Sequence, residues 1–251
     1  MNTLIAIAAL GAILSTIDAA SQKKRILVVT HTTGFRHADS IKVGEPIVKQ
    51  IGAGDGDFEV EYCRDGEDVK TMLTPEGLKR FDGVFFLNTT GDLGIPDLNA
   101  FLAWIKSGKA FIGVHSATDT YHNRKEFIEM IGGEFKTHGK QCTVEMKVEQ
   151  PNHPAVRHLG QSWTLFDEIY IMTENNRKNV TVLLSLDNYP DDGSPQANQP
   201  GDHLLAWTRA YGSGRVFYTA LGHRPDVWEK PEYQRHLIGG IRWALGLDEA
   251  R

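Results

Sequence analysis

Four of the ten histidines in this 251-residue chain stand just after apolar runs of the kind that form buried β-strands. Imidazole changes its charge near neutral pH, so a histidine at the right place can act as a general base. Neutral imidazole is also a good ligand for Zn, Ni, Cu and Fe. A group of histidines therefore predicts either acid–base or metal chemistry. The four are His31, His37, His115 and His223.

The elements that must position these histidines alternate along the first half of the chain. Apolar runs predict strands, and the segments between them carry helical patterns, such as the one that Thr74 caps and Pro75 opens. This alternation predicts an α/β fold with a parallel sheet and helices on both faces. The strands are expected at 25–30, 58–63, 83–87 and 110–114, and the helices at about 39–51, from 75, and at 96–106.

The second half is less regular. Segments of alternating polarity predict strands with one solvent-exposed face. A segment rich in Pro, Asp, Asn and Gly over 187–201 predicts a long surface loop, and the pattern over 231–245 predicts a C-terminal amphipathic helix. Cys63 and Cys142 are too few for a disulfide framework, and either one bridge or two thiols fits the sequence. The strands are expected at 143–148, 163–172, 179–185, 203–208 and 215–220.

Ligands of open α/β sheets bind beyond the carboxyl ends of the strands, so the side chains there are the candidate site. We predict His115, His223 and Asp119 as catalytic residues. A second set is predicted to bind substrate: Arg36, Asn88, Ser116 and Trp228. For Arg36 the alternative is a salt bridge within its loop, and for Trp228, as for Trp163 and Trp207, it is core packing rather than stacking on a sugar. His122, His158 and His236 have no supporting context and are expected at the surface.

The segment Gly-Val-His-Ser-Ala at 113–117 has the pattern of a nucleophile elbow, a sharp turn that lifts one side chain above the end of a sheet. His115 holds the raised position and Ser116 lies one place away. A serine nucleophile is therefore disfavoured, and a cysteine nucleophile is excluded at this turn. The alternative role for His115 is a hydrogen bond within a buried turn.

A divalent metal such as Zn is one candidate cofactor. We predict His31, His37 and His138 as its ligands, and a carboxylate such as Asp119 or Glu168 would complete a hydrolytic site. The chain contains no HExxH, CxxC or GxGxxG motif. The motifs typical of zinc proteases and of dinucleotide-binding proteins are therefore missing.

The formal net charge is −5 and no basic stripe is present, so nucleic acid is not an expected partner. Residues 4–17 are almost entirely apolar, a length typical of a signal-peptide core and short for a membrane span. We expect residues 1–20 to be a signal peptide, the protein to be periplasmic or extracellular, and the mature chain to have no membrane span. Asp18 and the absence of Lys or Arg before the run leave an uncleaved amphiphilic leader or a membrane anchor as the alternatives. One domain is expected over residues 25–247, and the sequence leaves its oligomeric state open.

Six segments of the chain, taken in order, form a recognisable pattern: residues 32–37, 113–119, 132–138, 153–154, 167–170 and 214–223. Together they resemble the trehalose-utilisation (ThuA-like) family. The resemblance implies the class I glutamine amidotransferase-like fold, a flavodoxin-like three-layer sandwich. It places His115 where amidotransferases have their catalytic cysteine, and His223 where they have its partner. Glutamine hydrolysis is thereby excluded, and different chemistry is implied.

The resemblance implies a link to disaccharide catabolism, with which the family is associated, especially to routes in which a glycoside is first oxidised to a 3-keto sugar. Our first hypothesis is an enzyme that binds a small sugar and uses His115 as base for hydrolysis, elimination or isomerisation next to a ketone. The second is a sugar-binding or accessory protein without turnover. A hydrolase with Ser116 as nucleophile is the least favoured.

Overall fold

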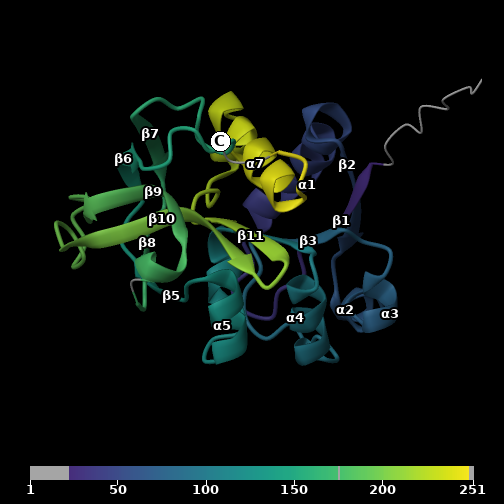
Figure 1. Cartoon of the computed structure of the whole chain (residues 1–251). Helices are drawn as coiled ribbons and strands as arrows, with labels where there is room; N and C mark the ends of the chain where they lie inside the picture. The colour runs from purple at the N-terminus through teal and green to yellow at the C-terminus, as the bar shows by residue number, and fades with distance from the viewer. Residues whose placement is uncertain (1–22, 175, 249–251) are drawn as a thin grey trace, which may run out of the picture.

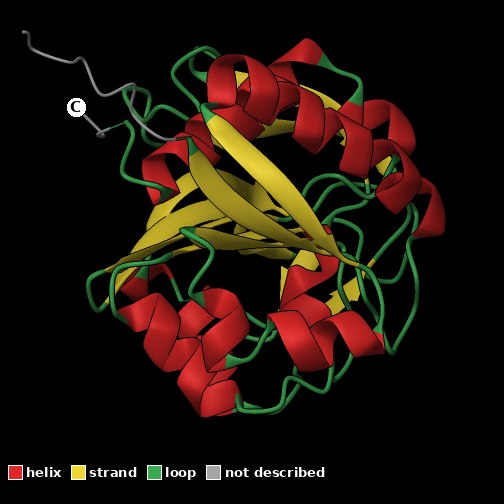
Figure 2. Ribbon diagram, turned by 90° about the vertical axis from the view of Figure 1, so that its right-hand side faces the viewer, coloured by secondary structure: helices red, strands yellow, loops and turns green. Residues whose placement is uncertain are grey.

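The computed structural model describes residues 23–174 and 176–248, so the predicted signal peptide lies outside the described residues. Within this range nine strands form one sheet in the order β2-β1-β3-β4-β11-β10-β9-β6-β7. Helices cover both of its faces (Figure 2), which confirms the predicted α/β sandwich. In Figure 1, α1 and α7 lie above the sheet and α4 and α5 lie below it. None of the helices among these residues combines the length and the apolar character needed to cross a bilayer.

The first half of the sheet is parallel and has the flavodoxin-like order β2-β1-β3-β4-β11. Its interior strands β3 and β4 are buried at every position, because helices cover both faces of a parallel sheet. This requirement explains the continuous apolar runs that made the strands predictable. The strands are β1 (Lys24–Val29), β2 (Phe58–Cys63), β3 (Gly83–Leu87), β4 (Ala110–Val114) and β11 (Gly214–Thr219).

The four predicted helices are present, and three further α-helices, α2, α5 and α6, were not predicted from the sequence. For α2 the signal is Asp65, whose carboxylate accepts the N–H groups of Glu67 and Asp68. Thr74 caps α3 as expected, with its hydroxyl 3.1 Å from the N atom of Gly77. The helical segments are α1 (Ala38–Ile51), η1 (Gly52–Gly56), α2 (Gly66–Met72), α3 (Pro75–Leu78), α4 (Leu98–Lys106), η2 (His115–Asp119), α5 (Lys125–Ile131), η3 (Arg177–Asn179), α6 (Pro225–Trp228) and α7 (Pro231–Ala244).

The second half extends the sheet with antiparallel strands that join it through β10 and β11. The single strand expected over 163–172 is wrong, because the chain leaves the large sheet after Asp167 and β8 pairs with β5 in a separate small sheet. The loop expected over 187–201 is shorter, since β9 and β10 run into it. The strands are β5 (Phe135–His138), β6 (Cys142–Val148), β7 (Ser162–Asp167), β8 (Tyr170–Met172), β9 (Thr181–Asn188) and β10 (Pro200–Tyr211).

The two cysteines lie far apart in this sheet. Cys63 is on the edge strand β2 and Cys142 is on β6, with strands β1, β3, β4, β11, β10 and β9 between them. Both are free thiols. Of the two alternatives left open by the sequence, two unpaired cysteines is the one observed.

The carboxylate of Asp97 begins α4, with Oδ1 accepting the N–H of Ala100 at 2.9 Å. Replacing Asp97 with Ala should lower the free energy of unfolding by about 1 kcal/mol, because a helix N–H loses its partner. Urea denaturation of Asp97→Ala beside Asp97→Asn measures this effect. Asn is an equally good cap, so an equal loss in both variants would contradict the capping role.

A histidine and carboxylate centre at the end of the parallel sheet

The chain turns sharply at the end of β4, and the turn is built around His115. Its φ is +50°, a left-handed conformation that non-glycine residues rarely adopt, and the 3₁₀ helix η2 begins there. The hydroxyl of Tyr218 donates to the carbonyl oxygen of His115 at 2.7 Å and supports the turn. The predicted elbow is therefore present, with a fully buried histidine at its apex.

The hydrogen bonds of His115 define which of its nitrogens is available. Its Nδ1 is 2.8 Å from the carbonyl oxygen of Ala220, which can only accept, so Nδ1 carries the proton. The Nε2 atom consequently holds a lone pair. Three groups surround that atom: the hydroxyl of Tyr170 at 2.9 Å, Nδ1 of His223 at 3.1 Å and a carboxylate oxygen of Glu168 at 3.5 Å.

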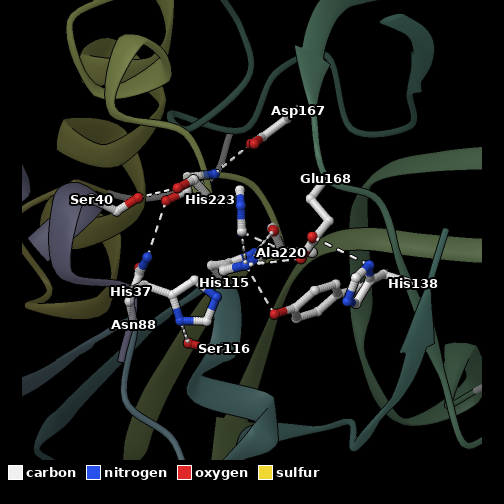
Figure 3. A network of polar contacts seen from close by, with 12 residues as sticks. His37, Ser40, Asn88, His115, Ser116, His138, Asp167, Glu168, Ala220 and His223 are labelled. Carbon is white, nitrogen blue, oxygen red and sulfur yellow. Dashed lines mark hydrogen bonds and ion pairs between the residues drawn. The ribbon is translucent and has the colours of Figure 1, made fainter. Parts of the chain in front are cut away.

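Three histidines and one glutamate meet around this point (Figure 3). One ligand atom from each of His37, His115, Glu168 and His223 lies within 4.8 Å of all the others. They come from the start of α1, the end of β4, the residue after β7 and the loop after β11. Three of the four histidines expected at strand ends therefore converge.

Burial keeps these imidazoles neutral. It lowers the pKa of His37 to about 3 and that of His115 to about 3, and for His37 the neighbouring imidazoles add to the effect. Burial, followed by His115, lowers the pKa of His223 to about 4. In contrast, burial raises the pKa of the Tyr170 hydroxyl well above its ordinary value. At neutral pH the centre thus presents imidazole lone pairs and one phenol proton.

Several predicted site residues lie elsewhere. His31 stands beside the start of α2, 3.9 Å from the position a Cβ would take on Gly66. Asp119 pairs with His122 rather than with the convergent histidines. His138 lies beside the other oxygen of Glu168, with Nδ1 3.2 Å from Oε1, whereas His115 and His223 face Oε2. Among the described residues, the side chains that could together hold a metal ion are His37, His115, Glu168 and His223, and His31 and His138 lie outside this group.

The tryptophan prediction is also wrong. Trp228 is fully buried and donates from Nε1 to the carbonyl oxygen of Gly222 at 3.0 Å, so its ring has no face free for a sugar. Trp163 and Trp207 are core residues as well. His236, expected at the surface, is a fully buried residue of α7.

The other predicted binding residues surround the centre with different roles. Ser116 lies 3.3 Å from Nδ1 of His37 and orients that ring. Asn88 is fully buried and donates to the carbonyl oxygen of Gly222 at 3.1 Å. Arg36 donates to the carbonyl oxygen of Thr30 at 2.7 Å, which ties its loop to the end of β1, and it also faces the cavity described next.

A cavity of about 340 Å³ opens onto the centre. His37 and His223 form part of its wall, and the sequence analysis missed three other wall residues, Phe35, Gln141 and Arg224. Phe35 is 70% exposed and its ring lies 4.9 Å from that of His37, so it offers an apolar surface at the entrance. A larger cavity of about 660 Å³ lies elsewhere, and none of the four convergent residues lines it. Because His37 and His223 line the smaller cavity, we take it as the candidate site.

Known proteins share this fold. A ThuA-like protein from Bacteroides uniformis is 22% identical, with a TM-score of 0.70 and coverage of 92% of this chain and 95% of that chain. A ThuA-like protein from Parabacteroides merdae is 19% identical, with a TM-score of 0.72 and coverage of 91% and 92%. A β-galactosidase from Bacillus circulans sp. alkalophilus contains a similar fold in 32% of its chain, at 9% identity and a TM-score of 0.55 over 92% of this chain.

No curated protein matches the sequence. The family described as trehalose utilisation, ThuA, matches residues 25–244 and so covers the whole sheet and the four convergent residues. Membership in this family suggests a role in sugar metabolism. The chain belongs to the ThuA trehalose-utilisation family.

Proposed function

We propose that this protein is a metal-dependent enzyme that acts on a sugar derivative, with His37, His115, His223 and Glu168 as metal ligands. The observation that carries the proposal is the convergence of these four side chains, two of which, His37 and His223, line a cavity. The family's description, trehalose utilisation, supports a small carbohydrate as the proposed substrate, with keto-glycosides as the preferred form. Sequence reasoning alone had placed the metal on a different set of histidines.

The donor set fits a divalent metal such as zinc. Ligand histidines must be neutral, and they are usually oriented by a second hydrogen bond to a carbonyl or hydroxyl oxygen. His115 has such a bond to Ala220, and His37 has one to Ser116. Three imidazoles with one carboxylate is a combination that zinc accepts.

A metal here would polarise a carbonyl oxygen or acidify a bound water. The chain itself would bind the sugar in the cavity, where Arg36, Arg224 and Gln141 offer polar groups and Phe35 offers an apolar face. The Tyr170 hydroxyl keeps its proton and supplies a hydrogen-bond donor beside the centre. Such a site can support hydrolysis, elimination or isomerisation next to a ketone.

A metal-free enzyme with His115 as general base is the second candidate. It uses the same lone pair on Nε2. A base works best when its pKa lies near the working pH, whereas burial lowers the pKa of His115 to about 3. This mismatch favours the role of ligand over the role of base.

Metal removal tests the proposal. The purified protein should contain one divalent metal per chain, lose turnover of oxidised disaccharides after dialysis against a chelator, and regain it with added Zn²⁺ or another divalent ion. His236→Gln, which alters a buried histidine outside the centre, should retain the metal. Turnover that persists without metal would replace the proposal by the metal-free one. Sugar binding without turnover of any oxidised or unoxidised disaccharide would make the protein a binding or accessory protein.

A variant of Glu168 distinguishes metal binding by this carboxylate from a role as a general base. If Glu168 is a ligand, Glu168→Gln should weaken metal binding at least tenfold, because an amide is a much poorer donor than a carboxylate. If Glu168 is only a base, the variant should keep its metal and lose turnover. Metal content and kcat measured on the same preparation distinguish these results, and we expect the first.

A further inference from the structure

The loop that carries His223 has no regular structure, yet side chains from four other parts of the chain hold its backbone. The carbonyl oxygen of Gly222 accepts hydrogen bonds from Asn88 at 3.1 Å and from Trp228 at 3.0 Å. The carbonyl oxygen of His223 accepts one from Ser40. A further partner of this loop is Asp167.

The carboxylate of Asp167 holds the loop from the N–H side. Its two oxygens accept separate hydrogen bonds, from the N–H of Gly222 at 2.7 Å and from the N–H of Arg224 at 3.2 Å. These two groups flank His223, so one carboxylate fixes the backbone on both sides of the imidazole. Asp167 is fully buried, and no water competes for these bonds.

The loop has little freedom to adapt. Gly222 has φ of +101°, and a Cβ at that position would collide with the hydroxyl of Tyr233. The next residue after Asp167 is Glu168, whose carboxylate lies 3.3 Å from Nδ1 of His223. Two consecutive side chains at the end of β7 therefore act on His223, one through its backbone and one directly on its ring.

We propose that Asp167 is a positioning residue that holds the His223 imidazole in the orientation the centre requires. The inference rests on the proposed function, since the orientation matters for a metal held jointly with His37 and His115. A carboxylate is needed because the two N–H groups bind different oxygens of Asp167. An asparagine would direct its own NH₂ group at one of them and break that bond.

The test compares Asp167→Asn with Asp65→Asn. Asp65 is the matched control, because its carboxylate also accepts two backbone N–H groups, at 2.9 Å each, but at the start of α2. With Zn²⁺ as the probe, Asp167→Asn should bind it about 10- to 100-fold more weakly than the parent, and Asp65→Asn should stay within about twofold. The imidazole ¹⁵N resonances of His223 should shift or broaden in Asp167→Asn alone.

Ser40→Ala, which removes the donor to the carbonyl oxygen of His223, keeps the inference testable if Asp167→Asn does not fold. It should shift the same His223 resonances and weaken Zn²⁺ binding by a smaller factor. Unchanged affinity together with unchanged His223 resonances in a folded variant would overturn the positioning role. If the parent binds no Zn²⁺ or other divalent ion, the proposed function fails, and the His223 resonances alone then decide the role of Asp167.

Discussion

Replacement of His115 by alanine should lower kcat/KM on the turned-over sugar by roughly 10³-fold or more. The same substitution should remove most of the bound metal. The reason is that Nε2 of His115 lies at the centre of the polar group, within 3.1 Å of both the Tyr170 hydroxyl and the His223 ring. Steady-state kinetics and metal content of the same preparation measure both effects.

The backbone at His115 complicates a simple alanine variant, because φ of +50° costs free energy for any residue with a Cβ. His115→Gly removes the imidazole and relaxes the backbone at once, so it should fold at least as well as His115→Ala and be equally inactive. Thr118→Ser is a conservative control in the same turn. Parental turnover in both His115 variants would mean that the chemistry takes place elsewhere.

Acid should unfold this protein well above the pH at which carboxylates titrate, because two histidines outside the centre are buried in neutral form. Burial lowers the pKa of His236 to about 3, and burial together with Arg157 lowers that of His153 to about 4. An unfolded histidine takes up a proton near pH 6.5, so the stabilisation is complete above that pH and is lost as the pH falls toward these values. Proton uptake by each of these histidines in the unfolded chain should lower the free energy of unfolding by about 2 kcal/mol between pH 7 and pH 5.

The hydrogen bonds of these two histidines explain why a proton added to either ring in the folded protein would not be stabilised. His236 donates from Nδ1 to the carbonyl oxygen of Ala155, and His153 accepts the N–H of the same residue on its Nδ1. Among the described residues, the Nε2 atoms of both rings have no hydrogen-bond partner. A charged His236 would therefore bury an unpaired N–H, and a charged His153 would oppose the N–H it now accepts.

Urea denaturation at several pH values tests this prediction with a control on the same helix. His236→Gln should flatten the dependence of unfolding free energy on pH between 7 and 5. Leu237→Ala removes an equally buried side chain and should lower stability by about 2 to 5 kcal/mol without changing that dependence. Identical pH dependence in the parent and in His236→Gln would refute the assignment.

The sequence was sufficient to predict the parallel half of the fold. Strands such as β4 are buried on both faces, so every residue from Ala110 to Val114 is apolar and the run ends abruptly at His115. The elbow was predictable because Gly113 and Ala117 flank His115, and a side chain at 113 would come within 3.4 Å of Tyr218, Ala117 and Ile131. Convergence of His37, His115 and His223 followed from the rule that parallel strands end at one edge.

Glu168 could not be predicted as firmly as the three histidines, because it comes from the irregular half. Asp167 and Glu168 are adjacent carboxylates before an apolar run, and periodicity alone does not reveal that the chain changes sheets between them and Tyr170. His31 was misplaced for a related reason. The loop after β1 is long enough to turn one histidine toward α2 and the other toward the elbow, and strand-end position does not distinguish them.

The division of the sheet into parallel and antiparallel halves has an evolutionary consequence. All three imidazoles are attached to the parallel half, while the carboxylate arrives with the antiparallel extension. A change confined to the antiparallel extension would keep His37, His115 and His223 in place and exchange Glu168 for another group. The chemistry of the centre can therefore vary in this fold through changes in the antiparallel extension, while the parallel half of the sheet stays the same.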